Sequence, residues 1–254
     1  GVCEAMGRFT NQIDSEMNTH QIQGGFQFSA VKIDSLGATE YTLATIVMDG
    51  SGSVSPFWQQ IQLGLKEVVQ ACRRSPRADN LMLRVVVFSD GVDEIHGFKP
   101  LPDCNEIDYD ALPFPGGSTA LFDASYSAVK ATTDYGRKLT EAQFSVNGAV
   151  YILTDGDDNR SKTTAKMVGE AIREARTTEA MESIVPVLIG VNTDVNDLNR
   201  FLDRFQKEAG FQQYIAIGKA TEKELAKLGG FISKSISSQS QALGTGGPSQ
   251  SLTF

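Results

Sequence analysis

Short apolar runs alternate with amphipathic segments along most of the chain. Tyr41–Met48, Leu81–Phe88 and Ala149–Thr154 are predominantly apolar, as strands buried on both faces of a sheet are. The segments that follow carry apolar residues three and four positions apart, which predicts helices with one face against a sheet. The clearest such series is Phe57, Ile61, Leu65, Val68 and Cys72. The alternation predicts an α/β fold with a doubly wound, mostly parallel central sheet flanked by helices.

Three further segments complete the predicted sheet. Ser183–Val191 and Phe211–Ile217 are apolar and predict strands, and Glu94–Phe98 predicts a short strand at an edge. Pro186 interrupts the first of these runs. Because proline cannot donate a ladder hydrogen bond, it predicts that this strand lies near the edge of the sheet.

The division of the chain follows from where this alternation begins and ends. No break in composition occurs between residues 40 and 236, which predicts one domain over that range. Residues 1–39 precede it as an N-terminal extension, in which residues 26–33 predict a short strand. Residues 237–254 are rich in serine, glycine and glutamine, a composition typical of a flexible tail.

Composition and charge argue against two kinds of partner. The 254-residue chain is 41% hydrophobic and 21% charged, as globular domains are. Its formal net charge is −8, and the sequence has no basic stripe of the kind that holds a phosphate backbone, so we expect no nucleic-acid partner. No apolar run approaches the ~18 residues of a membrane-spanning helix, so we expect no membrane span.

The cysteines indicate a reducing compartment. Cys3, Cys72 and Cys104 are odd in number and widely spaced, which suits neither a disulfide framework nor a Cys-x-x-Cys metal site. A single disulfide in a secreted protein is the alternative that this spacing leaves. Because thiols stay reduced in the cytosol, we expect a cytoplasmic protein.

Oxygen-bearing side chains follow two of the buried strands. Asp49-Gly50-Ser51-Gly52-Ser53 comes directly after the first strand, and Asp155-Gly156 comes directly after Ala149–Thr154. Gly116-Gly117-Ser118-Thr119 ends a long loop just before a predicted helix. Ligands of open α/β sheets bind outside the carboxyl ends of the strands, where the strand order reverses. We therefore expect these three segments to meet there.

These side chains are hard oxygen ligands, which suit Mg²⁺, Mn²⁺ or Ca²⁺ better than Zn²⁺ or Cu²⁺. Asp49, Ser51 and Ser53 alternate, and the glycines between them permit a tight loop that turns all three inward. Taken singly, each segment has a simpler explanation as a turn or as a loop before a helix N-cap. Their combination at strand ends favours a metal site.

Together the three segments resemble the metal-ion-dependent adhesion site (MIDAS) of von Willebrand factor A domains. The resemblance covers about residues 40–236, includes the order of strands and helices, and implies a Rossmann-like fold. The site that it implies for Mg²⁺, or for Mn²⁺ or Ca²⁺, consists of Asp49, Ser51, Ser53, Thr119 and Asp155. Among subfamilies, the chain is most similar to bacterial intracellular members associated with tellurite resistance and stress responses.

The segment at Gly116–Thr119 departs from the family pattern by one residue. The usual Gly-Gly-Thr is here Gly116-Gly117-Ser118-Thr119. We assign the ligand to Thr119 because the following Ala-Leu-Phe-Asp-Ala then stays in step with the family's helix. Ser118 is the alternative ligand.

The resemblance implies a protein-binding module and no catalytic role. Serine and threonine hydroxyls are neutral ligands, so the ion stays electropositive and attracts a Glu or Asp carboxylate from a protein partner. Two alternatives stay open. One is a metal-dependent phosphatase or other hydrolase that uses the same acids, although Ser51 stands where an aspartyl nucleophile would need a second acid. The other is a scaffold subunit with a structural metal. The sequence does not indicate the oligomeric state.

Overall fold

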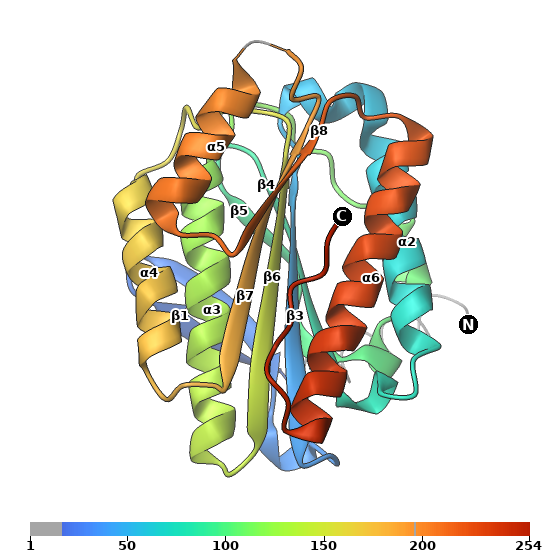
Figure 1. Ribbon diagram of the computed structural model, residues 1–254, viewed down its shortest axis with the longest axis vertical. Helices are drawn as coiled ribbons and strands as arrows, with labels where there is room; N and C mark the ends of the chain where they lie inside the picture. Colours follow the sequence, from blue (N-terminus) through green and yellow to red (C-terminus); the bar gives the residue numbers. More distant parts are fainter. Residues whose placement is uncertain (1–16, 196) are drawn as a thin grey trace, which may run out of the picture.

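The strands of the protein lie side by side in one twisted sheet (Figure 1). The computed structural model describes residues 17–195 and 197–254. Within them, eight strands follow the order β1-β2-β5-β4-β3-β6-β7-β8. The strands are β1 (Met17–Ile22), β2 (Phe26–Val31), β3 (Glu40–Asp49), β4 (Leu81–Phe88), β5 (Val92–Pro100), β6 (Ser145–Thr154), β7 (Ser183–Val191) and β8 (Gln213–Ile217). The α-helices are α2 (Trp58–Arg73), α3 (Leu121–Glu141), α4 (Ala165–Thr177), α5 (Leu198–Ala209) and α6 (Glu222–Thr245).

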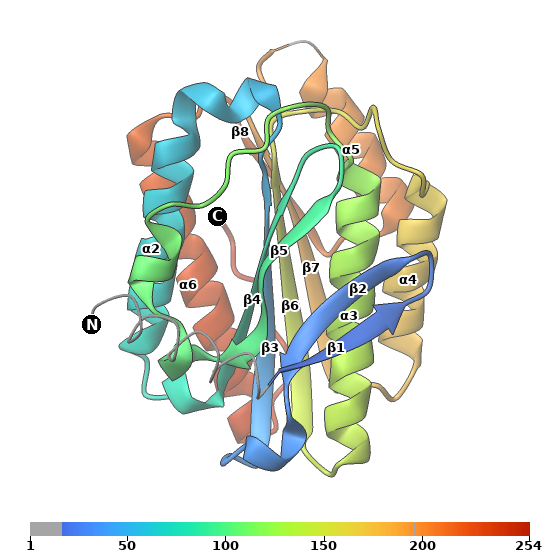
Figure 2. The same cartoon turned by 180° about the vertical axis from the view of Figure 1, so that it is seen from behind.

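Helices cover both faces of this sheet. Helices α3, α4 and α5 lie on one face, and α2 and α6 lie on the other (Figures 1 and 2). The five strands from β4 through β3, β6 and β7 to β8 are parallel neighbours, while β4 pairs with β5, and β1 with β2, in antiparallel fashion. The prediction of a doubly wound, mostly parallel α/β sheet is therefore confirmed. Among the described residues, no helix is long and apolar enough to cross a membrane.

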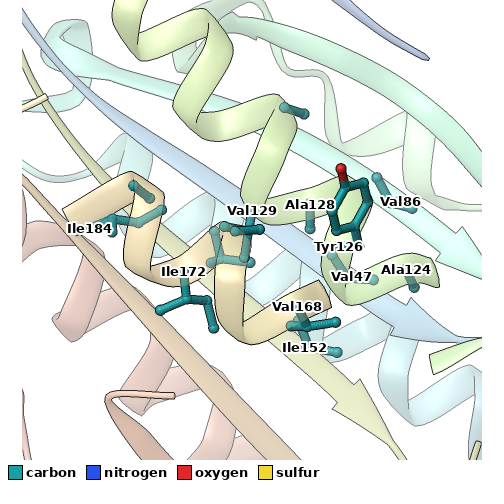
Figure 3. Packing of buried hydrophobic residues seen from close by; sticks show 14 of the residues in the cluster. Val47, Val86, Ala124, Tyr126, Ala128, Val129, Ile152, Val168, Ile172 and Ile184 are labelled. Carbon is teal, nitrogen blue, oxygen red and sulfur yellow. The ribbon is translucent and has the colours of Figure 1, made fainter. Parts of the chain in front are cut away.

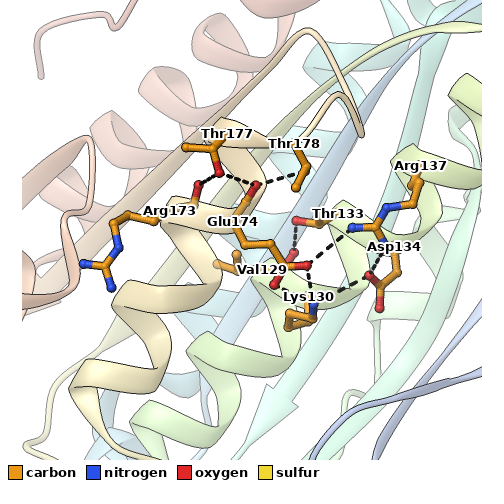
Figure 4. Close-up of polar contacts among 9 residues, drawn as sticks. All are labelled: Val129, Lys130, Thr133, Asp134, Arg137, Arg173, Glu174, Thr177 and Thr178. Atoms are coloured by element: carbon orange, nitrogen blue, oxygen red, sulfur yellow. Dashed lines mark hydrogen bonds and ion pairs between the residues drawn. The ribbon is translucent and has the colours of Figure 1, made fainter.

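The core between the sheet and α3 and α4 combines small, branched and aromatic side chains (Figure 3). Val168 and Ile172 of α4 are fully buried and lie close to Val129 and Ile152 in Figure 3. Burial of each such side chain contributes about 1.5–3 kcal/mol. On the outer side of this layer, a charged cluster joins the two helices (Figure 4). Its Lys130 Nζ lies 3.0 Å from Glu174 Oε2.

The predicted edge strand at Glu94–Phe98 has a neighbour on both sides, so the prediction was wrong about its position. The strand is the longer β5, and β2 pairs with it in parallel at Ala30 and Phe98. Gly97 makes this close approach feasible, because a Cβ atom there would lie 1.9 Å from the carbonyl oxygen of Ser29. The hairpin of β1 and β2 thus extends the same sheet, and β1 is the strand at this edge.

The expectation that Pro186 places its strand near a sheet edge is met, because β7 is the neighbour of the edge strand β8. The Pro186 carbonyl accepts a hydrogen bond of 2.9 Å from Gln212 N, just before β8 begins. In a strand, the nitrogen of a residue faces the same side as its carbonyl. The nitrogen of Pro186 therefore faces the region before β8, and its missing N–H removes no ladder hydrogen bond.

The C-terminal segment differs from the flexible tail expected for residues 237–254. Helix α6 continues to Thr245, because Gln239 and Leu243 on its inner face are buried. Beyond the helix, Gln239 Nε2 donates a hydrogen bond of 2.7 Å to the carbonyl of Gln250. The Phe254 ring packs edge-on against Phe231, with 5.7 Å between ring centroids. The segment runs back along α6, as Figure 1 shows at the C-terminus.

We expect this terminal packing to contribute to stability. Phe254→Ala should lower the free energy of unfolding by about 1–2 kcal/mol, because it removes a partly buried aromatic contact. Thr253 is exposed, so Thr253→Ala is the matched control and should leave stability unchanged. Urea denaturation of the two variants checks this. Equal stability of the two variants would mean that the segment is free in solution.

The described cysteines are buried thiols without a disulfide. Burial raises the pKa of Cys72 to about 12 and that of Cys104 to about 11, so both stay protonated near neutral pH. Cys72 lies in the core, as the helical pattern predicted. Cys3 lies outside the described residues.

Candidate metal centre

The predicted site lies where the strand order reverses. Strands β3 and β6 are parallel neighbours, and Met48 is in register with Leu153 near their carboxyl ends. From β3 the chain passes to β4 on one side, whereas β6 is followed by β7 on the other side. Asp49 is the last residue of β3, and Asp155 directly follows β6. The topology therefore brings the two residues to the carboxyl ends of these central strands, and the strand ends lie at the top of Figure 2.

Asp49 is held in place through both of its oxygens. It is 1% exposed, Oδ1 accepts a hydrogen bond of 2.8 Å from Ser51 N, and Oδ2 accepts one of 2.6 Å from the Thr154 hydroxyl. Gly50 makes room for this turn, because a Cβ atom there would lie 2.8 Å from Val87 and 2.9 Å from Pro115. The carboxylate thus has a fixed orientation before any ligand arrives.

Ser51, Ser53 and Asp155 form a continuous chain of contacts beside Asp49. The Ser51 and Ser53 hydroxyl oxygens are 3.3 Å apart. The Ser53 hydroxyl donates a hydrogen bond of 2.7 Å to Asp155 Oδ1. The alternation of Asp49, Ser51 and Ser53 therefore does turn these side chains toward a common point that includes Asp155.

Thr119 approaches the same point from the loop before α3. It is 5% exposed, and it is fixed by two backbone contacts: Thr119 N donates to Asn159 Oδ1 over 2.8 Å, and Asn159 N donates to Thr119 O over 3.1 Å. Its hydroxyl oxygen lies beside Gly156, where an added Cβ would be 3.1 Å away. The glycine of Thr-Asp-Gly thus leaves space for Thr119. Ser53, Thr119 and Asp155 line one cavity.

Ser118 has a different surrounding. Its backbone N–H donates a hydrogen bond of 2.8 Å to Asp90 Oδ1. The two preceding glycines turn the loop with φ of +66° at Gly116 and +91° at Gly117, in the region that favours glycine. A Cβ atom on Gly117 would lie 2.8 Å from Asp90 Oδ2, so this loop packs tightly on Asp90. Ser118 is also absent from the residues that line the cavity of Thr119.

We expect the two hydroxyls to differ in their effect on metal binding. Thr119→Ala should weaken Mn²⁺ binding by about tenfold, because it removes a hydroxyl oxygen that lines the same cavity as Asp155. Ser118→Ala should weaken it by less than about twofold. Calorimetric titration of both variants with Mn²⁺ checks this prediction. The reverse order would assign the ligand to Ser118 and show an alignment error of one residue.

The electrostatics of the site suit a cation. Among the described residues, neither Asp49 nor Asp155 forms an ion pair with a basic side chain. Burial raises the pKa of Asp49. Burial, with a further contribution from the charge of Asp49, raises the pKa of Asp155 to about 6. Two acids that lie close together without a positive partner are stabilised as anions when a cation sits between them.

The donor set fits a hard divalent ion. It combines two carboxylates with the hydroxyls of Ser51, Ser53 and Thr119, all of them oxygen donors. In the part of the chain that the structure describes, no three His, Cys, Asp or Glu side chains gather into a metal site. An ion held here would therefore have few charged ligands and would favour Mg²⁺, Mn²⁺ or Ca²⁺ over softer metals.

Several supporting residues had no signal in the sequence. Thr154 and Asn159 orient Asp49 and Thr119, and both contacts join segments distant along the chain. Asp158 Oδ1 accepts from Phe122 N over 3.1 Å, at the start of α3. An Asn or Asp in a loop could equally be a solvated turn residue, so only the tertiary structure identifies these roles.

The cavity at this edge has a volume of about 770 Å³. Part of its lining comes from the candidate metal ligands and the loop after β6, and part from α5 and the loop before it. The residues that line it are Ser53, Gly117, Thr119, Asp155, Gly156, Asp157, Asn159, Asn192, Val195, Asp197, Leu198, Arg200, Phe201 and Arg204. A ligand that fills this cavity from Asp155 would also contact α5.

No family model matches the chain, and no curated protein matches its sequence. Solved structures match it in fold. The PilB minor pilin from Streptococcus sanguinis has a TM-score of 0.58 at 15% identity, over 90% of this chain and 68% of the pilin. A von Willebrand factor type A structure from Catenulispora acidiphila has a TM-score of 0.57 at 14% identity, over 84% of this chain and 44% of that one.

A third match is the proximal thread matrix protein 1 of the mussel byssus, in a structure with a zinc-occupied MIDAS motif. Its TM-score is 0.52 at 20% identity, over 78% of this chain and 46% of the mussel protein. At such identities the likeness is one of fold. The chain therefore has the Rossmann-like α/β fold that von Willebrand factor A domains share.

Proposed function

We propose that the protein is a metal-dependent protein-interaction module. A divalent ion, Mg²⁺ in the first place, is held by Asp49, Ser51, Ser53, Thr119 and Asp155, directly or through water, and binds a Glu or Asp carboxylate of a partner protein. The observation that carries this proposal is the convergence of two carboxylates and three hydroxyls at the reversal point of the sheet, where neither carboxylate forms an ion pair with a described basic side chain.

The donor set favours binding of an external anion. Hydroxyl ligands leave the positive charge of the ion in place, and both oxygens of Asp49 already accept hydrogen bonds from the protein. Mg²⁺ retains exchangeable positions when a protein offers few ligands. A partner carboxylate can fill such a position with a charge-assisted contact, which is stronger than a neutral one.

The structural neighbours support an interaction role in general. A pilin, a byssus matrix protein and a pilus adhesin are among them, and one of these structures is described with a metal in its MIDAS motif. We propose that this chain shares the metal-dependent mode of binding and has no catalytic role.

The test compares partner capture with and without metal. The immobilised protein is incubated with native lysate in Mg²⁺ or in EDTA, and captured partners are mapped to the acidic residue that they require. We expect EDTA and Asp155→Ala each to abolish capture. The double mutant of Asp155 and the partner acid should bind little worse than either single mutant, because both act on one contact. Capture that survives EDTA, or full additivity, would mean that the ion is structural.

A further inference from the structure

We propose that the cavity beside the metal centre binds an acidic segment of the partner, with a second carboxylate of that segment paired to Arg204 of α5. This inference rests on the proposed function. It extends that function to the partner residues that flank the carboxylate bound to the ion. It identifies a specificity-determining residue outside the set of metal ligands.

Helix α5 and the candidate metal centre line the same cavity. Asp155 and Thr119 contribute to its lining beside the metal centre, and Phe201 and Arg204 contribute to it from α5. Helix α5 stands beside the loops at the top of the molecule in Figure 1. An extended peptide that reaches the ion with one side chain and fills this cavity would contact α5 with its neighbouring residues.

Charge decides what kind of segment fits. Three acids, Asp155, Asp157 and Asp197, and two arginines line the cavity, and Asp49 adds a further negative charge to the site, which gives a net charge of −2. A bound dication neutralises this charge. An acidic segment is thus repelled before the ion binds, whereas afterwards the ion and the arginines can attract its carboxylates locally, even though the whole chain has a formal net charge of −8.

The two arginines are not equivalent. Arg200 Nη1 lies 3.5 Å from Asp197 Oδ1, so a carboxylate within the chain already neutralises it in part. Arg204 has no ion pair among the described residues, and its guanidinium lies 5.8 Å from the centroid of the Phe201 ring. A guanidinium held against an aromatic face keeps its donor edge available for a bidentate carboxylate contact.

The cavity lining also includes apolar side chains beside the candidate metal centre and Arg204. Val195 is 51% exposed at the rim of the cavity, and Phe201 of α5 is only partly buried. Exposed apolar side chains in a polar cavity gain most from an apolar side chain of a ligand. We therefore expect a partner segment with one acid for the ion, a bulky apolar residue, and a second acid for Arg204.

Selection of peptides tests this inference. Phage-displayed random peptides are selected on the immobilised full chain in Mg²⁺ and then eluted with EDTA, so that only metal-dependent binders are recovered. Three proteins are compared: the wild type, Arg204→Glu and Arg173→Glu. Arg173 is exposed on α4 and points away from the neighbouring charged cluster in Figure 4, so it provides the same charge change elsewhere.

We expect wild type and Arg173→Glu to select peptides with two acids that flank an apolar residue. Arg204→Glu should select peptides that keep one acid and lose the second or replace it with Lys or Arg. A two-acid peptide from the wild-type selection should bind Arg204→Gln about tenfold more weakly. The inference would be overturned, and the proposed function left intact, if the wild type selected EDTA-eluted peptides with a single acid. The same holds if Arg204→Glu kept the two-acid preference of the wild type. If the wild type yields no EDTA-eluted peptides, both are overturned.

Discussion

Asp49→Ala is expected to weaken Mg²⁺ and Mn²⁺ binding by about 100-fold or more, and calorimetric titration should lose its single binding event. Asp49 is the most buried acid of the site, and its position is fixed by Ser51 N and the Thr154 hydroxyl. Its removal takes away charge at the centre of the donor set and frees the loop that orients Ser51 and Ser53. The other ligands cannot compensate, because the Ser53 hydroxyl is already hydrogen-bonded to Asp155.

Two further variants separate loss of a ligand from loss of charge and loss of fold. Asp157→Ala removes the same charge from the rim of the cavity but leaves the donor set intact, so it should weaken binding by no more than about threefold. Asp49→Asn keeps an acceptor for Ser51 N while it removes the charge. Circular dichroism of each variant reports whether the fold is kept. If a folded Asp49→Ala binds Mn²⁺ as the wild type does, the proposed metal centre is wrong.

The succession of strands and helices along the chain and the place of the candidate site could be predicted because their determinants are local. The apolar runs that became β3, β4 and β6 differ clearly from the helical periodicity around them. The positions of Asp49 and Asp155 then follow from the general geometry of parallel sheets. The supporting contacts of Thr154 and Asn159 join residues far apart in sequence, so no local pattern indicates them.

The errors have physical causes too. Composition favoured a flexible tail over residues 237–254. Composition contains no information on spacing, and Gln239 and Leu243 lie four residues apart on one buried helix face. Pro186 predicted a strand near the sheet edge, and β7 is next to the edge strand β8, because only the side that the proline nitrogen faces needs to be unpaired. The run Leu81–Phe88 was treated as apolar, and Arg84 within it is buried in the sheet beside Glu94.

This buried pair should dominate the stability of the N-terminal edge of the sheet. Arg84 is 1% exposed, and its Nε lies 2.6 Å from Glu94 Oε2. Its Nη1 and Nη2 atoms have no hydrogen-bond partner among the described residues. Glu94 also accepts a hydrogen bond of 2.9 Å from Ser29 N, which joins β2 to β5. One carboxylate therefore compensates a buried cation and anchors the hairpin.

Glu94→Gln should lower the free energy of unfolding by about 3 kcal/mol, because it leaves the Arg84 charge buried without a counter-charge, while an acceptor for Ser29 remains. Replacement of both residues, Arg84→Met with Glu94→Gln, should restore stability to within about 1 kcal/mol of the wild type, since the desolvation cost of the cation disappears with it.

The exposed pair of Lys207 and Asp203, 2.7 Å apart, is the matched control. Asp203→Asn should cost less than about 1 kcal/mol because water screens that pair. Urea denaturation of the three variants and the wild type measures these differences. A Glu94→Gln effect no larger than that of Asp203→Asn would show that the Arg84 charge is compensated by groups other than Glu94.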